Sequence, residues 1–186
     1  MSEVVDSRAF QKIGDAVPNL ELPAISGGMR ELQSFLDGKR GGVFVFWSGV
    51  CSHCVRYVPY FNQLETRHPE IGFAAIAARY SETAEELRQV VAERNLTFPI
   101  LHSADSSAAA QFFAQQTPRA YLVDPARKLL YRGAVDNFKG PCDPDYQAYL
   151  EPAIESFLSG RPIERPETAS FGCAIKTVYY TLPKIL

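Results

Sequence analysis

The sequence predicts an α/β sandwich around one mixed β-sheet, and three features indicate this class. Segments 42–47 and 71–78 are apolar and β-rich throughout, which is typical of parallel strands covered on both faces. Segments with helical periodicity follow both strands. Two strand-like runs, 119–124 and 128–135, flank a short turn and predict an antiparallel hairpin. Strands that alternate with helices and finish in a hairpin and a helix favour a mixed sheet between helices.

The start of the chain predicts less regular structure than the rest. Residues 1–15 are polar and predict a loose lead-in. Pro18 and Pro23 interrupt the apolar stretch 16–25. Because proline cannot donate to a strand ladder, we expect edge strands or extended chain there.

Periodicity predicts four longer helices, over residues 52–67, 83–95, 106–115 and 146–158. The first contains Pro59, which should kink it. The second begins with Thr83 and Glu86 at the spacing of a capping box. In the last, Pro152 should bend the helix or shift its beginning.

Composition excludes several classes of protein. The chain has 186 residues, 46% of them hydrophobic and 22% charged, which is ordinary for a soluble globular protein with one sizeable core. The net charge is −2 and no block of like charge stands out, so we expect no nucleic-acid partner. No apolar run approaches the roughly 20 residues that span a bilayer, and residues 1–12 lack the pattern of a signal peptide.

A cysteine pair is the strongest functional signal. Cys51 and Cys54 follow directly after a predicted buried strand and open a predicted helix. A cysteine at a helix N-terminus lies where unpaired N–H groups and the macrodipole favour an anion, so the pKa of Cys51 should fall. The Cys51 thiolate is therefore expected to attack a substrate disulfide, and Cys54 to resolve the mixed disulfide. His53, between them, should tune the pKa further.

Zinc binding is a weaker interpretation of the cysteine pair. Zinc usually takes a second pair of Cys or His ligands, whereas Cys142 and Cys173 are isolated singles. A purely structural disulfide at a strand–helix junction is equally disfavoured. We expect no metal and no cofactor.

The chain resembles the thioredoxin superfamily in several motifs. The stretch FWSGVCSHCVRYVP matches the family's strand, tryptophan, Cys-x-x-Cys and helix pattern, with Trp47 and Pro59 at the family's positions. Thr117-Pro118 matches the family's cis-proline. Between Cys54 and Pro118 the chain carries an extra predicted helix, 83–95, and an extra predicted strand, 98–101. These two segments resemble the insertion of the TlpA-like and redoxin branch. The resemblance implies a thioredoxin-like three-layer sandwich with an inserted helix–strand unit, in a bacterial protein of cell redox homeostasis.

The resemblance also implies a substrate site. The Thr117–Pro118 bond should be cis and face the cysteines, and the flanking backbone should pair with an extended substrate peptide. By motif position, Trp47 is favoured as a substrate platform over a core residue. Val45 and Tyr57 occupy positions where relatives carry a buried carboxylate that helps deprotonate the second cysteine. Two alternatives follow: proton transfer in reduction is slower, or another group serves.

The remaining cysteines suggest a second bond. Two cysteines, Cys142 and Cys173, remain outside the motif, and an even number allows them to pair. The C-terminal tail has no other evident anchor. We therefore expect a secondary disulfide between them that ties an extension, 161–186, onto a domain formed by 16–160. Two free thiols, or a second redox pair that relays electrons, are the alternatives.

The sequence thus predicts a thiol–disulfide oxidoreductase that acts on protein substrates together with an unknown redox partner, in a direction left open. The alternatives are a thiol peroxidase of the peroxiredoxin kind, a thioredoxin-fold copper carrier and a redox-inert binding module. Ser48 fits part of the peroxidase motif, but Phe44 stands where that motif needs proline. We expect a monomer that does not span a membrane, in the periplasm or outside the cell, with the cytoplasm as the alternative.

Overall fold

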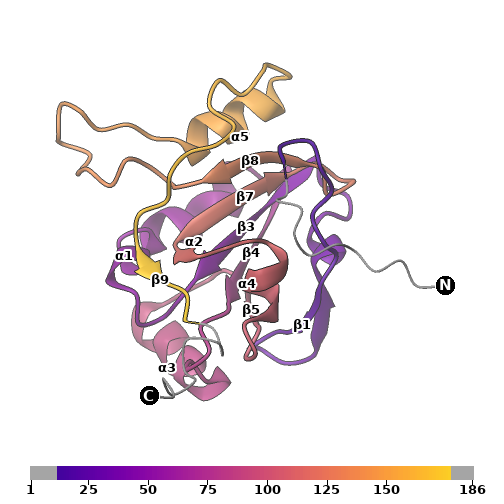
Figure 1. Ribbon diagram of the computed structural model, residues 1–186, viewed down its shortest axis with the longest axis vertical. Helices are drawn as coiled ribbons and strands as arrows, with labels where there is room; N and C mark the ends of the chain where they lie inside the picture. The colour runs from indigo at the N-terminus through magenta and orange to yellow at the C-terminus, as the bar shows by residue number, and fades with distance from the viewer. Residues whose placement is uncertain (1–11, 177–186) are drawn as a thin grey trace, which may run out of the picture.

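A five-stranded mixed sheet lies at the centre of the structure, a computed structural model that describes residues 12–176. Its strands run, in spatial order, β5 (Ile100–His102), β4 (Ile71–Ala77), β3 (Gly41–Trp47), β7 (Arg119–Val123) and β8 (Leu129–Gly133). β3, β4 and β5 are parallel, whereas β7 is antiparallel to both β3 and β8 (Figure 1). The predicted α/β sandwich with a mixed sheet is confirmed.

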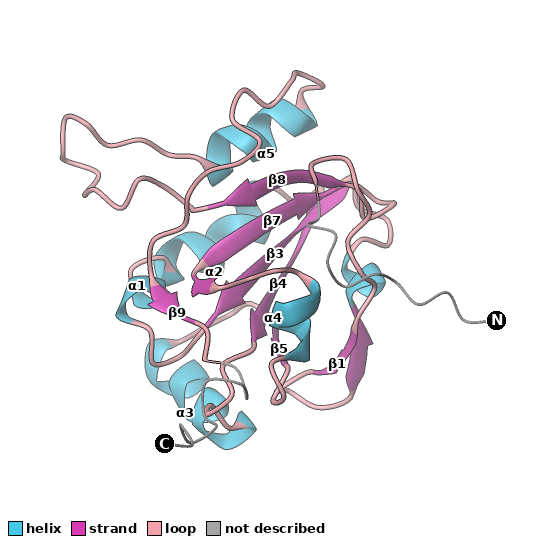
Figure 2. Ribbon diagram, in the orientation of Figure 1, coloured by secondary structure: helices cyan, strands magenta, loops and turns pink. Residues whose placement is uncertain are grey.

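Helices cover both faces of this sheet (Figure 2). Along β3 the side chains alternate between two apolar clusters: Val43 and Val45 belong to one, Phe44 and Phe46 to the other. The first cluster contains residues of α2 (Val58–Arg67), α3 (Ala84–Arg94) and α5 (Leu150–Leu158). The second contains residues of the 3-10 helix η1 (Leu32–Phe35) and of α4 (Ser107–Gln111). Every residue of β3 and β4 is buried, as their apolar sequences predict.

The helix expected over 52–67 is divided in two. α1 (Ser52–Val55) ends before Arg56, and α2 begins at Val58 with Pro59 in its first turn. A first-turn N–H has no intrahelical acceptor, so proline costs little there. The same reason accounts for the start of α5 at Leu150 rather than at residue 146, since this start puts Pro152 in the first turn.

The other elements lie close to their expected positions. α3 has the predicted capping box, with Thr83 as the N-cap residue and Glu86 completing it. The expected edge structure near the start is a hairpin of β1 (Glu21–Pro23) and β2 (Met29–Glu31). β5 begins two residues later than the strand expected over 98–101, and α4 is shorter than the helix expected over 106–115. No helix within residues 12–176 is long and apolar enough to cross a membrane.

The chain after α5 returns to the sheet (Figure 1). It ends in the short strand β9 (Cys173–Ala174), which pairs antiparallel with β6 (Gln116–Thr117). Ile175 then enters the second apolar cluster and is 5% exposed. The expected lead-in is described only from residue 12, and the last ten residues of the expected extension lie outside the described residues.

Candidate active site

The two motif cysteines lie where β3 passes into α1. Cys51 is the N-cap residue of α1, and Cys54 lies inside that helix, with its N–H donating to the Cys51 carbonyl at 2.9 Å. Both side chains are completely buried. The first cysteine therefore faces the end of the helix that favours negative charge, and the second lies deeper in the protein.

The two thiols have opposite acidities. The pKa of Cys51 is lowered from 9.0 to about 4, chiefly because the Cys54 thiol hydrogen-bonds to its sulfur, with burial opposing the shift. Hydrogen bonds from Cys173 and Thr117 lower it further. The pKa of Cys54 is raised well above 9.0, first by burial and then by Cys51. At neutral pH the pair therefore consists of one thiolate and one thiol.

The Thr117–Pro118 peptide bond is cis and adjoins the cysteines. The Cys51 sulfur lies 3.4 Å from the Thr117 carbonyl oxygen. Antiparallel pairing of β3 with β7 places Phe46 opposite Arg119, which brings the residues just before β7 toward the end of β3. Two segments that are 66 residues apart in sequence thus meet at one sulfur atom.

The chain's own tail lies against this site. β9 places Cys173 opposite Thr117, and the Thr117 hydroxyl donates to the Cys173 carbonyl at 3.4 Å. The Cys173 thiol is in hydrogen-bonding contact with the Cys51 sulfur. Cys142 is exposed on the loop between β8 and α5. The expected Cys142–Cys173 disulfide is therefore wrong for this structure, in which both are free, because strand pairing places Cys173 beside Cys51 instead.

Trp47 is a core residue rather than a substrate platform. Its side chain is fully buried and packs edge-on against Phe98, with ring centroids 6.1 Å apart. β3 is the central strand and is covered on both faces, so a side chain at its end lies inside the first cluster. The motif position predicted closeness to the cysteines but not that the indole would be covered.

His53 lies between the cysteines and beneath the long loop that precedes α5. Its ring is tilted against Phe138, with centroids 4.6 Å apart, and its buried Nδ1 has no hydrogen-bond partner in the described part of the chain. Arg56 holds the same loop, because its guanidinium donates to the carbonyls of Phe138 and Lys139. The pKa-tuning role of His53 stays a prediction.

Glu82 holds the loop that precedes Cys51, and sequence reasoning missed it. Its Oε1 accepts hydrogen bonds from the Gly49 N–H at 2.5 Å, the Ser48 hydroxyl at 3.2 Å and the Val50 N–H at 3.3 Å. Burial is the main cause that raises the pKa of Glu82 above 4.5. Arg94 donates to the Gly49 carbonyl at 2.7 Å. Glu82 is distant from the motif in sequence, so only the fold reveals it.

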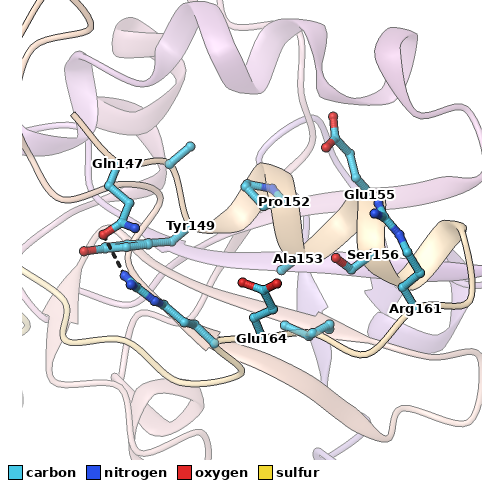
Figure 3. A pocket seen from close by; sticks show the side chains of 11 residues that line it. Gln147, Tyr149, Pro152, Ala153, Glu155, Ser156, Arg161 and Glu164 are labelled. Atoms are coloured by element: carbon cyan, nitrogen blue, oxygen red, sulfur yellow. Dashed lines mark hydrogen bonds between the residues drawn. The ribbon is translucent and has the colours of Figure 1, made fainter. Parts of the chain in front are cut away.

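One cavity, of about 390 Å³, lies away from this chemistry (Figure 3). It is lined by α5 and by the segments on either side of it, which are joined where Arg165 donates to Gln147 at 2.6 Å. None of its lining residues is a cysteine. Within residues 12–176, no group of three or more His, Cys, Asp or Glu side chains is arranged to hold a metal ion.

Comparison with known proteins identifies the family. A model of the AhpC/TSA family matches residues 13–132, a segment that includes both motif cysteines and Pro118. The chain belongs to the AhpC/TSA family. Cys173 lies outside the matched segment of this AhpC/TSA protein.

Curated relatives of this AhpC/TSA protein are named thiol-disulfide oxidoreductases. Thiol-disulfide oxidoreductase ResA from Oceanobacillus iheyensis is 27% identical over 128 residues, which are 67% of this chain and 66% of the relative. ResA from Bacillus cereus is 29% identical over 64% of this chain and 68% of its own length. The chain thus spans about two thirds of the length of these relatives.

Solved structures agree on the fold. A hypothetical protein from Sinorhizobium meliloti superposes with a TM-score of 0.80 and 25% identity, over 90% of this chain and 96% of that one. A putative thiol:disulfide interchange protein DsbE from Chlorobium tepidum gives a TM-score of 0.65 and 19% identity, over 79% and 98%. This AhpC/TSA protein thus has the fold of these solved structures, as its sequence predicts, and its curated relatives are named thiol–disulfide oxidoreductases.

Proposed function

We propose that Cys51 and Cys54 exchange a dithiol and a disulfide with protein substrates. The Cys51 thiolate attacks a substrate disulfide, so that a Cys51–substrate bond forms and one substrate sulfur leaves. Cys54 then gives up its proton and attacks the Cys51 sulfur, which forms the Cys51–Cys54 disulfide and releases the reduced substrate. Run backwards, the same steps oxidise a substrate dithiol.

The observation that supports this proposal best is the asymmetry of the two thiols. The low pKa of Cys51 provides the nucleophile at neutral pH, and the raised pKa of the buried Cys54 keeps it protonated until resolution. A thiolate stabilised in the reduced form also makes a couple more oxidising. The low pKa of Cys51 therefore favours oxidation of substrates, and a measurement of the redox potential decides the direction of exchange.

The peroxidase alternative has less support. The Ser48 hydroxyl, which fits part of the peroxidase motif, already donates to Glu82, and Phe44 is buried in β3 where that motif needs proline. A peroxidoxin from Mycobacterium tuberculosis does share the fold, with a TM-score of 0.63 and 20% identity. Fold likeness of this kind does not choose between the two reactions.

An extracytoplasmic location is part of the proposal. One structural neighbour is a secreted disulfide oxidoreductase of Mycobacterium tuberculosis, which is 24% identical with a TM-score of 0.53. Disulfide exchange with protein substrates suits such oxidising compartments. We further propose that the protein acts as a monomer with a separate redox partner.

The test is a redox titration of the full-length protein in glutathione buffers, with thiols trapped and counted by mass spectrometry. We expect one reversible two-electron step at Cys51–Cys54, lost in Cys51→Ser and retained in the matched control Cys142→Ser. A step between about −180 and −120 mV would indicate an oxidase or isomerase, and one below about −250 mV a reductase. No reversible step, or peroxide turnover that exceeds disulfide exchange, would contradict the proposal.

A further inference from the structure

The tail occupies the strand edge beside Cys51. β9 pairs with β6, so that Cys173 lies opposite Thr117, and the Ile175 N–H donates to the Gln115 carbonyl at 2.9 Å. Beyond the strand, the Tyr80 N–H donates to the Lys176 carbonyl at 3.0 Å. The tail is therefore held by strand pairing at Cys173 and by backbone hydrogen bonds at the two residues after β9.

This arrangement has the form of strand addition by a bound peptide. An extended segment adds to an exposed strand edge through main-chain hydrogen bonds, and its alternate side chains enter the site. Here the added strand belongs to the same chain, and the side chain that it brings to the reactive Cys51 is a cysteine. Cys173 thus has the position of a substrate cysteine in a mixed disulfide.

Gly172 makes this close approach feasible. A Cβ atom added there would lie 1.9 Å from the Thr117 carbonyl oxygen, which is part of the backbone and cannot move aside cheaply. Any larger residue would push the tail away from β6. The fit is therefore specific to the docked tail, and it offers a way to undock the tail without changing a cysteine.

We propose that Cys173 is a third redox-active cysteine, which exchanges with the Cys51–Cys54 disulfide as an internal substrate; this rests on the proposed function of that pair. The Cys173 thiolate attacks the Cys51 sulfur, so that the Cys51–Cys173 bond forms and the Cys51–Cys54 bond breaks. Cys54 leaves as a thiolate and takes up the proton that Cys173 gave. One disulfide and one thiol are present before and after, so no external oxidant is needed.

The consequence is competition between the tail and protein substrates. While β9 is docked, the edge of β6 is occupied, so that an external peptide has to displace the tail. A cysteine held beside Cys51 also reacts at a far higher effective concentration than a free thiol. The tail thus both covers the site and stores the disulfide until a substrate binds.

The first experiment oxidises the full-length Cys54→Ser variant with oxidised glutathione and maps its disulfides. Cys51 first takes glutathione, and Cys173 then displaces it, so we expect a Cys51–Cys173 disulfide. In Cys54→Ser/Cys173→Ser the glutathione adduct should persist on Cys51. The matched control Cys54→Ser/Cys142→Ser should behave like Cys54→Ser.

The mapping needs cleavage after glutamate. Trypsin leaves Cys142 and Cys173 in one peptide, because Arg161 and Arg165 are both followed by proline. Cleavage after glutamate puts Cys51, Cys142 and Cys173 in separate peptides, which are residues 32–65, 94–155 and 168–186, because Glu151 is followed by proline.

Two results would overturn the inference alone: a glutathione adduct that persists on Cys51 in Cys54→Ser with Cys173 free, or a bond between Cys173 and Cys142. The absence of any adduct in Cys54→Ser/Cys173→Ser would instead overturn the proposed function as well. The two failures are therefore distinguishable.

The second experiment undocks the tail with Gly172→Ala in the Cys54→Ser background. Displacement of glutathione by Cys173 should slow by about tenfold or more, because a small misplacement of the reacting atoms is enough to lose that rate. The matched control is Gly140→Ala, since a Cβ at Gly140 meets no atom within 4 Å. Equal rates in the two variants would overturn the proposed role of the docked strand.

Discussion

Cys51 shows how much of the chemistry depends on single neighbours. Its low pKa has a hydrogen bond from Cys54 as the first cause, ahead of contributions from Cys173 and Thr117. Burial acts in the opposite direction, so without these neighbours the same position would hold a thiol. The helix N-terminus alone does not account for the nucleophile, because the partner cysteine supplies the largest part.

Titration of the reduced protein tests the contribution of Cys54 to the pKa of Cys51. We expect the Cys51 thiolate to form as the pH rises through about 4. The Cys54→Ala variant should titrate closer to 9.0, because it lacks the donating thiol. Thiolate absorbance in the ultraviolet, with the Cys51→Ser signal subtracted, measures both midpoints, and Cys142→Ser is the control. A wild-type midpoint near 9.0 would contradict the assignment.

At the scale of elements, the loop between β3 and α1 depends on the loop that precedes α3. Glu82 accepts hydrogen bonds from residues 48–50, and His102 at the end of β5 lies 2.9 Å from the Glu82 carbonyl oxygen. Glu82 thus holds the segment that delivers Cys51, and His102 in turn contacts the backbone of Glu82. Glu82 is a positioning residue, since its contacts are with the loop and not with the sulfur atoms.

Replacing Glu82 should separate hydrogen bonding from charge. Glu82→Ala should cost about 1 to 3 kcal/mol of unfolding free energy, because it leaves buried donors without an acceptor. Glu82→Gln keeps an acceptor oxygen but cannot ionise. Since burial raises the pKa of Glu82, the folded state binds the proton more tightly than the unfolded state does. The wild type should therefore gain stability over Glu82→Gln as the pH falls toward 4.5, and lose that gain as the pH rises.

Urea unfolding of both proteins at neutral and mildly acidic pH measures the difference. The exposed Glu93 of α3 offers the matched control, Glu93→Gln. A stability difference between the wild type and Glu82→Gln that does not change with pH, or that changes with the opposite sign, would show that the Glu82 proton is not linked to folding.

On the scale of the whole molecule, the tail joins the second apolar cluster to the reactive site. Ile175 is buried in that cluster, and Cys173 two positions earlier contacts Cys51. Side chains two residues apart on an extended chain point to the same side, so burial of Ile175 and presentation of Cys173 are coupled. Docking of the tail is thus a packing event with a redox consequence.

Ile175→Ala should loosen the tail without disturbing the sheet. Removing a buried isoleucine costs about 2 to 5 kcal/mol in an intact core, and here the loss is limited by release of the tail. We expect faster hydrogen exchange at residues 173–176 and unchanged protection in β3 and β4. The control is Lys176→Ala, because that side chain is exposed. Equal loss of protection throughout the sheet would mean that the tail is part of the global folding unit.

The sequence by itself determined the parts of this protein that depend on local pattern. The buried strands β3 and β4, the capping box of α3 and the cysteine pair between a strand and a helix all follow from periodicity and short spacings. Local steric rules also placed Pro59 and Pro152 at irregularities, although the helix starts required the structure.

Only the tertiary structure decided what surrounds the cysteines. Pairing of β9 with β6 joins Cys173 to Thr117 across 56 residues, which no local pattern encodes. Glu82 reaches the loop before Cys51 across 33 residues, and Trp47 is covered because β3 is central in the sheet. Such contacts arise from how strands are ordered and which segments share a core, so they appear only when the whole chain is folded.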